Sequence, residues 1–248
     1  MKIKTLILLT LAFSICIFSC KKAPLTIGKT ITESRPLDDF NKVYINDDVS
    51  VTLVKSDSCW IEITTGENLM DNITVNVDLS DSSFSIKNEN TMSFLRPYDY
   101  TLHATLYFKD IVLLHSSTSG YIDTYNQLNG QNKCHIVIDD ASGDMDITIH
   151  DCPRIDITYT FGTSNVILHG SNNKKIYAQK HSYGILDTRD CDAENVIITN
   201  WASGDCYISA SKSIKSEIYH IGDIYYKGNP EQITEFYGPI ARGRLIQL

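Results

Sequence analysis

The sequence predicts an all-β protein built as a parallel β-helix with coils of about 20 residues. Three observations predict this fold. Glycines recur at a nearly constant interval through the second half of the chain, apolar residues follow each glycine with a period of two, and a further apolar run precedes each glycine. Such self-similarity is typical of a solenoid, in which each coil buries its apolar face only against its neighbours.

The repeat is anchored by glycines separated by 23, 19, 22, 20 and 18 residues: Gly120, Gly143, Gly162, Gly184, Gly204 and Gly222. The residues two places after them are Ile122, Met145, Ser164, Leu186, Cys206 and Ile224. The residues four places after them are Thr124, Ile147, Val166, Thr188, Ile208 and Tyr226. Both columns are mostly apolar or β-branched, so they predict one strand per coil with these side chains in the core.

A second strand is predicted ahead of each glycine, as in Ile136 with Ile138 and Val196 with Ile198. The glycine then marks a tight corner between the two strands, because only glycine adopts positive φ at little cost and because stacked backbones approach closely there. Serine before the glycine and aspartate after it, as at 142–144 and 203–205, suit such a turn.

Residues 1–19 have the pattern of a lipoprotein signal peptide, with Lys2 and Lys4 ahead of an apolar run. Residues 17–20, Ile-Phe-Ser-Cys, resemble a lipobox, in which the cysteine is lipidated and becomes the mature N-terminus. We therefore predict lipidation at Cys20, a tether over 20–36, and an outer-membrane location on the periplasmic or the surface face. The alternative is an ordinary signal peptide with a chance cysteine.

The mature chain divides at about residue 110. Residues 37–110 are strand-rich with weaker register, and they form either early coils of the helix or a separate sheet. Residues 111–248 hold the clear coils and a C-terminal cap. A shared core makes 37–248 one continuous domain in this interpretation.

Charge and cysteines narrow the function classes. The formal net charge of −8 argues against a nucleic-acid partner, whose phosphates attract clusters of Lys and Arg. The mature cysteines beyond Cys20 are odd in number, so buried reduced thiols are favoured over a disulfide framework. These cysteines are Cys59, Cys134, Cys152, Cys191 and Cys206, of which Cys134 and Cys152 are the pair to check.

Several segments together resemble one protein family. They are the opening at 35–53, the stretches at 62–69 and 84–87, the Ser-Gly-Asp corners, and the closing 222–230. They are similar to the putative auto-transporter adhesin, head-GIN domain family of Bacteroidota lipoproteins, over about residues 35 to 245. The resemblance implies a right-handed single-stranded β-helix of pectin-lyase-like shape. It brings no catalytic residues, and residues 161–163 and 183–185 depart from the Ser-Gly-Asp corner.

The residues three places after the glycines form a candidate ligand or cation site: Asp123, Asp146, Asn165 and Asp187. Stacked strands lie about 4.8 Å apart, so neighbouring carboxylates there repel each other. A Ca²⁺ ion, the only cofactor we consider, or a positive ligand would offset the repulsion. Two such carboxylates also suit glycoside hydrolysis. The favoured interpretation is solvated surface.

A second candidate site is an aromatic patch in the last coils, chiefly Trp201, Tyr207 and Tyr225. Exposed aromatics stack on sugars and anchor interfaces. The competing role is to cap the open end of the solenoid, which we favour for Phe236 and some of the tyrosines. The scattered histidines show no zinc spacing, and no nucleophile, phosphate-loop or dinucleotide motif is present.

The sequence therefore predicts a non-enzymatic cell-envelope binding or adhesion module for a glycan or for an envelope or host protein. One alternative is a polysaccharide-active enzyme that uses the exposed aspartates. We rank it lower because the glycine spacings leave little spare chain to wall a cleft. Another alternative is a structural role in the outer membrane, with a homo-oligomer held by end-to-end or side-by-side contacts.

Overall fold

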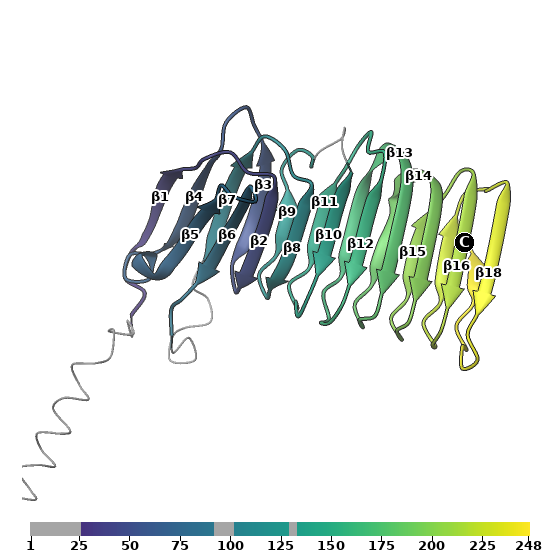
Figure 1. Ribbon diagram of the computed structural model, residues 1–248. Helices are drawn as coiled ribbons and strands as arrows, with labels where there is room; N and C mark the ends of the chain where they lie inside the picture. The colour runs from purple at the N-terminus through teal and green to yellow at the C-terminus, as the bar shows by residue number, and fades with distance from the viewer. Residues whose placement is uncertain (1–25, 92–101, 129–132) are drawn as a thin grey trace, which may run out of the picture.

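The protein is a stack of flat coils, as the computed structural model shows for residues 26–91, 102–128 and 133–248 (Figure 1). Nineteen strands and one 3₁₀ turn, η1 (Met70–Asn72), make up its regular structure in these ranges. Strands of successive coils pair in parallel, and from β9 onward register partners lie 18 to 23 residues apart in sequence. The prediction of an all-β parallel β-helix is confirmed.

Each coil contributes one strand to each of two rows. The first row runs β5 (Ile73–Asp78), β6 (Ser83–Asn88), β2 (Lys42–Asp47), β8 (Leu113–Thr118), β10 (Cys134–Ile138), β12 (Ile155–Tyr159), the ends of β13 (Val166–Lys180) and β14 (Leu186–Asn200), β16 (Ser213–Ile218) and β18 (Gln232–Tyr237). The second row runs β1 (Thr30–Pro36), β4 (Trp60–Gly66), β7 (His103–Phe108), β3 (Ser50–Lys55), β9 (Ile122–Thr124), β11 (Met145–Thr148), the starts of β13 and β14, β15 (Cys206–Ser209), β17 (Ile224–Lys227) and β19 (Leu245–Gln247).

The N-terminal region contributes one full coil and a differently built end. Strands β2 and β3 pair in parallel with β8 and β9, so they form the first regular coil. The chain then leaves the stack, and β6 and β7 return beside β2 and β3. Strands β1, β4 and β5 pair antiparallel at the outside of this end (Figure 1). Of the two arrangements left open by the sequence, residues 37–110 therefore contain an early coil, and their antiparallel strands extend the same rows and do not form a separate sheet.

The core is one continuous cluster of inward side chains from both rows. In the second row Met145, Val166 and Leu186 stack in register and are almost completely buried. In the first row Ile155, Ile176 and Val196 do the same. Burial of each such side chain stabilises the fold by about 1.5–3 kcal/mol. Coil stacking is therefore driven by a continuous apolar interior, as in other solenoids.

Glycine is required at the corners because the backbones of neighbouring coils nearly touch there. A Cβ atom added at Gly143 would lie 1.9 Å from the carbonyl oxygen of Gly120. One corner departs from the predicted alignment: Gly162 bridges to Ala141, and Ser164 takes the place under Gly184. Two additional residues at this corner therefore shift the following strand by two places.

Buried polar side chains line the inner side of the same corners. Tyr159, Lys180 and Asn200 follow one another in register, and all three are buried. The Tyr159 hydroxyl donates to the carbonyl of Ser164 at 3.1 Å, and the Lys180 ammonium donates to the carbonyl of Gly204 at 2.8 Å. These bonds satisfy corner carbonyls that strand pairing leaves free.

The cysteines are packing residues. Cys59, Cys134, Cys152, Cys191 and Cys206 are all buried, and none of these five forms a disulfide. Burial raises the pKa of Cys191 and of Cys206 to about 12. No disulfide joins Cys134 and Cys152, and both side chains pack as small, largely apolar groups.

The C-terminal end of the stack is an open edge. All six residues of β18 are exposed, and its inward positions are Ile233, Glu235 and Tyr237. The Tyr237 hydroxyl contacts the Glu235 carboxylate and accepts a hydrogen bond from the Leu245 amide, so the ring spans the two rows. Phe236 points outward and lies against Tyr219. Tyr237 thus covers the core end, and Phe236 does not.

Candidate functional site

The predicted aspartate column is only partly continuous. Asp123 and Asp146 are register partners on β9 and β11. The next position in the column is Ile167, and Asp187 follows it on β14. Asp187 is therefore two strands away from Asp146. Because strands are spaced by about 4.8 Å, only the first two carboxylates are direct neighbours.

Asn165 lies outside this column because of the two additional residues at its corner. Its backbone N–H donates to the Asp144 carboxylate at 2.7 Å, and its side-chain oxygen accepts from the Ile185 N–H at 3.0 Å. The Asp223 N–H donates to Asp205 in the same way, at 2.8 Å. These Asp and Asn side chains form a ladder that ties each coil to the next, so Asn165 has a structural partner on both sides.

Two of the column's carboxylates contact basic side chains of the protein. The Nε2 atom of His169 lies 3.0 Å from Oδ1 of Asp146. The Arg189 guanidinium contacts both carboxylate oxygens of Asp187. Partial burial opposes the charge of Asp187, but the hydrogen bonds from Arg189 outweigh it and lower the pKa of this carboxyl. Asp146 and Asp187 therefore each have a partner within the protein.

The predicted aromatic patch is divided between two stacks. Trp201 lies parallel to Tyr219, with ring centroids 3.6 Å apart, and His181 stacks at 5.7 Å on the same tryptophan. Tyr207 and Tyr225 stack at 5.0 Å on the outer face of the other row, and the Arg189 guanidinium lies 4.5 Å from the Tyr207 centroid. Because aromatic faces are used within each stack, these side chains chiefly hold neighbouring coils together.

A groove on the third side of the coils was not predicted. It arises from a change in coil length. Ile176 pairs with Val196, twenty residues on, whereas Val196 pairs with Ile214, eighteen residues on. Leu186 and Cys206 are again twenty apart, so the shortening falls between β15 and β16. The segment between β15 and β16 is shorter than the corresponding segments of the neighbouring coils, and this difference leaves a hollow in the surface. A groove can therefore form without long insertions between the coils.

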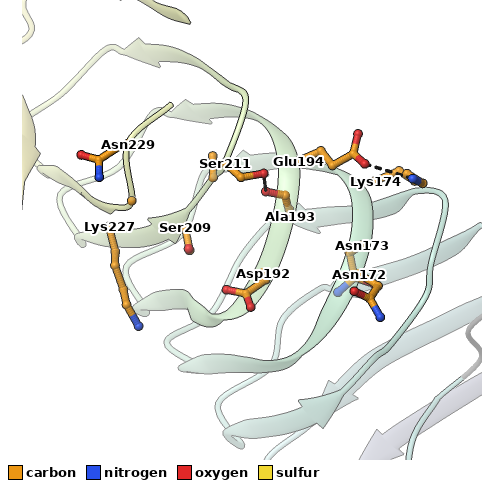
Figure 2. Close-up of a pocket in the computed structure, with 12 residues that line it drawn as sticks. Asn172, Asn173, Lys174, Asp192, Ala193, Glu194, Ser209, Ser211, Lys227 and Asn229 are labelled. Carbon is orange, nitrogen blue, oxygen red and sulfur yellow. Dashed lines mark hydrogen bonds and ion pairs between the residues drawn. The ribbon is translucent and has the colours of Figure 1, made fainter. Parts of the chain in front are cut away.

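The groove has a volume of about 600 Å³ and is lined by residues of four successive coils, most of which carry polar or charged side chains. Its floor is the shortened segment 209–211. Figure 2 shows Lys227 and Asn229 on one side of Ser209, with Asn172 and Asp192 on the other. The lining residues with no polar side chain are all small: Ala193, Ala210 and Gly228.

The charges in and around the groove are mostly paired with one another. Glu194 accepts from Lys174 at 3.0 Å and from Lys212 at 2.8 Å. Hydrogen bonds from Lys212 and then Lys174 lower the pKa of the Glu194 carboxyl. Lys227 lies 3.7 Å from Asp190. The groove therefore presents a balanced set of charges.

A smaller set of groove side chains has its hydrogen-bonding capacity free. Within the described part of the chain, the side chains of Asp192, Ser209 and Asn229 have no protein partner. A carboxylate, a hydroxyl and an amide together supply both acceptors and donors. This arrangement can bind a ligand rich in polar groups, and no sequence motif marks it. The available signal was the fall in glycine spacing to 18 between Gly204 and Gly222.

The described residues bear on the hypotheses of a metal site and a membrane-spanning helix, but not on lipidation. In residues 26–91, 102–128 and 133–248, no three His, Cys, Asp or Glu side chains are grouped to hold a metal ion. The same ranges contain no helix of the length and apolarity that crossing a bilayer requires. Residues 1–25, with the signal peptide and Cys20, lie outside the described residues. The Ca²⁺ site and lipidation therefore stay predictions.

Comparisons with known proteins agree with the fold. A family model described as putative auto-transporter adhesin, head GIN domain, matches residues 39–230. Among curated proteins, no sequence match is found. A putative adhesin from Bacteroides fragilis is similar in structure, with a TM-score of 0.79, 18% identity, and coverage of 90% of this chain and 99% of that one.

Two further solved structures are similar. A putative adhesin from Parabacteroides merdae gives a TM-score of 0.64 at 18% identity, covering 89% of this chain and 97% of that chain. A putative lipid binding protein from Parabacteroides distasonis gives 0.67 at 17% identity, covering 88% and 97% respectively. At these identities the likeness concerns the fold alone.

Proposed function

The chain belongs to the putative auto-transporter adhesin, head GIN domain family, and from this membership we propose that it is a non-enzymatic binding module of the cell envelope. The proposed binding surface is the groove lined by residues 172–174, 192–194, 209–211 and 227–229, and the proposed partner is a glycan or a protein of the envelope or host. The single observation that carries this proposal is the hollow of about 600 Å³ whose Asp192, Ser209 and Asn229 side chains are unpartnered.

Binding is preferred to catalysis because of where the acidic side chains lie. General acid–base chemistry on a sugar needs two carboxylates facing one substrate bond. Asp123 and Asp146 lie side by side on a strand face, and Asp146 is occupied by His169. Neither residue lines the groove. A binding role asks only for complementary polar contacts, which the groove supplies.

We further propose that Cys20 carries a lipid anchor in the outer membrane. The motif at 17–20 supports this. The predicted tether over 20–36 is too long, because its residues 30–36 form β1, so residues 21–29 link Cys20 to the first strand. Growth with an alkyne-bearing fatty acid tests it. The full chain should take up the label and fractionate with membranes, and Cys20→Ala should lose both properties. A labelled Cys20→Ala protein would overturn the proposal.

The binding role is tested with the full chain in detergent micelles, passed over immobilised fractions of bacterial envelope and host-cell surface. Saturable binding to at least one fraction is expected. It should fall about tenfold or more in the Asp192→Ala/Asn229→Ala double variant, because charged and polar hydrogen bonds are lost together. Asp38→Ala removes an exposed carboxylate far from the groove and is the matched control. Absence of saturable binding to every fraction would overturn the role.

A further inference from the structure

We infer that the ligand of the groove is an uncharged oligosaccharide chain lying along the axis of the solenoid. This inference rests on the proposed function, since it assigns a ligand class to the same groove. The direction of the ligand, its lack of charge and its recognition by hydrogen bonds each follow from a separate property of the groove lining.

The direction follows from which coils line the groove. The equivalent positions are Asn172 on β13, Asp192 on β14, Ser209 at the end of β15 and Lys227 at the end of β17. They belong to four successive coils, each displaced by about 4.8 Å from the last. Polar groups therefore recur at a regular step along the axis. A polysaccharide, which also repeats its hydroxyl groups at a regular step, can meet the same kind of contact in each coil.

The absence of net charge follows from the pairing within the lining. The lining cations are Lys174 and Lys227, and the lining anions are Asp192 and Glu194. Both cations already have carboxylate partners, namely Glu194 and Asp190. A polyanion would find no free cation there and would also meet a chain of net charge −8. An uncharged chain costs no such repulsion.

The recognition chemistry follows from the free side chains and from the lack of apolar anchors. Sugar hydroxyls donate and accept hydrogen bonds, which suits the carboxylate of Asp192, the amide of Asn229 and the hydroxyl of Ser209. A peptide ligand gains much of its affinity from side chains that fill apolar pockets. Here the lining residues include no large aliphatic or aromatic side chain that could form such a pocket.

The test uses the full chain in detergent micelles on an array that carries neutral glycans, uronic-acid and sulfated glycans, and unglycosylated peptides. Binding to a subset of neutral glycans of several sugar units is expected. Asp192→Ala and Asn229→Ala should each weaken it about tenfold. Asp38→Ala should not. A signal confined to anionic glycans or to peptides, or no signal with any neutral glycan, would overturn the inference.

A second measurement separates this inference from the proposed function. Periodate cleaves vicinal diols and so destroys most sugar epitopes while leaving peptide bonds intact. Binding to envelope or host fractions should disappear after periodate treatment of the immobilised fraction. Groove-dependent binding that survives periodate would reject the glycan and keep the binding role. Absence of binding before treatment would reject the binding role itself.

Discussion

The Nζ atom of Lys180 lies 2.8 Å from the carbonyl oxygen of Gly204, inside the solenoid. The lysine is fully buried, and the same carbonyl also accepts from the Asn200 amide at 3.0 Å. Desolvation lowers the pKa of Lys180. The Lys180 side chain is thus bound inside the solenoid by the Gly204 carbonyl, for which Asn200 is a second hydrogen-bond donor.

Lys180→Met should leave the free energy of unfolding at pH 7 unchanged or raise it by about 1 kcal/mol, because an apolar side chain of similar length removes a buried charge. Gly204 keeps its bond from Asn200. Since folding lowers the pKa of Lys180, the unfolded chain binds more protons, and this residue makes stability rise with pH below about 10.4. Urea unfolding at pH 7 and 9.5 should show that extra rise in the wild type only. A loss of several kcal/mol in Lys180→Met at pH 7 would contradict the account.

Gly143→Ala should destabilise the protein by about 3 kcal/mol or more. This is at or above the largest usual cost of overpacking a core, because the backbone of the neighbouring coil must move to make room for the added methyl group. The added Cβ would lie 1.9 Å from the carbonyl oxygen of Gly120. Denaturant unfolding measures the change, and Ser142→Ala at the neighbouring position is the control. Equal stability of the two variants would show that the corners are not close-packed.

Trp201→Ala should cost about 1–2 kcal/mol of stability, since it breaks stacking on both Tyr219 and His181. A double-mutant cycle with Tyr219→Ala should give a coupling of about 1 kcal/mol. Glycan binding should not change, because neither ring lines the groove. Unchanged stability together with lost binding would make Trp201 a ligand contact.

Glu235→Val should make the protein associate end to end. Glu235 stands at an inward position of the edge strand β18, in register with buried Ser216. A copy stacked on this edge would bury the carboxylate, and inward charges of this kind protect natural sheet edges. Light scattering after gel filtration should show larger species for Glu235→Val and none for Thr234→Val, whose side chain points outward. A monomeric Glu235→Val would mean that another feature protects the edge.

The coil repeat could be predicted from the sequence because stacking imposes the same steric demand on every coil. Gly143 and Gly184 mark corners where backbones nearly touch, and Met145 and Leu186 fill the same inward column. The glycine alignment was wrong at one corner. Two additional residues there place Gly162 against Ala141 and move Asn165 out of the aspartate column. A glycine count cannot distinguish a corner glycine from one placed two residues early.

The groove could not be predicted because it depends on a length difference and not on a motif. Asp192 and Asn229 belong to different coils, and nothing in their local sequence indicates that they border one hollow. The antiparallel end built by β1, β4 and β5 has a similar cause, since the pairing of distant strands decides it. The ion-pair partners His169 and Arg189 were also missed. Arg189 follows Asp187 by two residues, and His169 follows Ile167, the register partner of Asp146, by two residues.

The most direct test of the central claim is a hydrogen–deuterium exchange footprint of the full chain, with and without polysaccharide extracted from the cell envelope and host surface. The account predicts protection over 172–174, 192–194, 209–211 and 227–229, and none on β9 or around Trp201. Protection confined to the strand carrying Asp123, or to the aromatic stacks, would contradict the assignment of the groove as the binding surface.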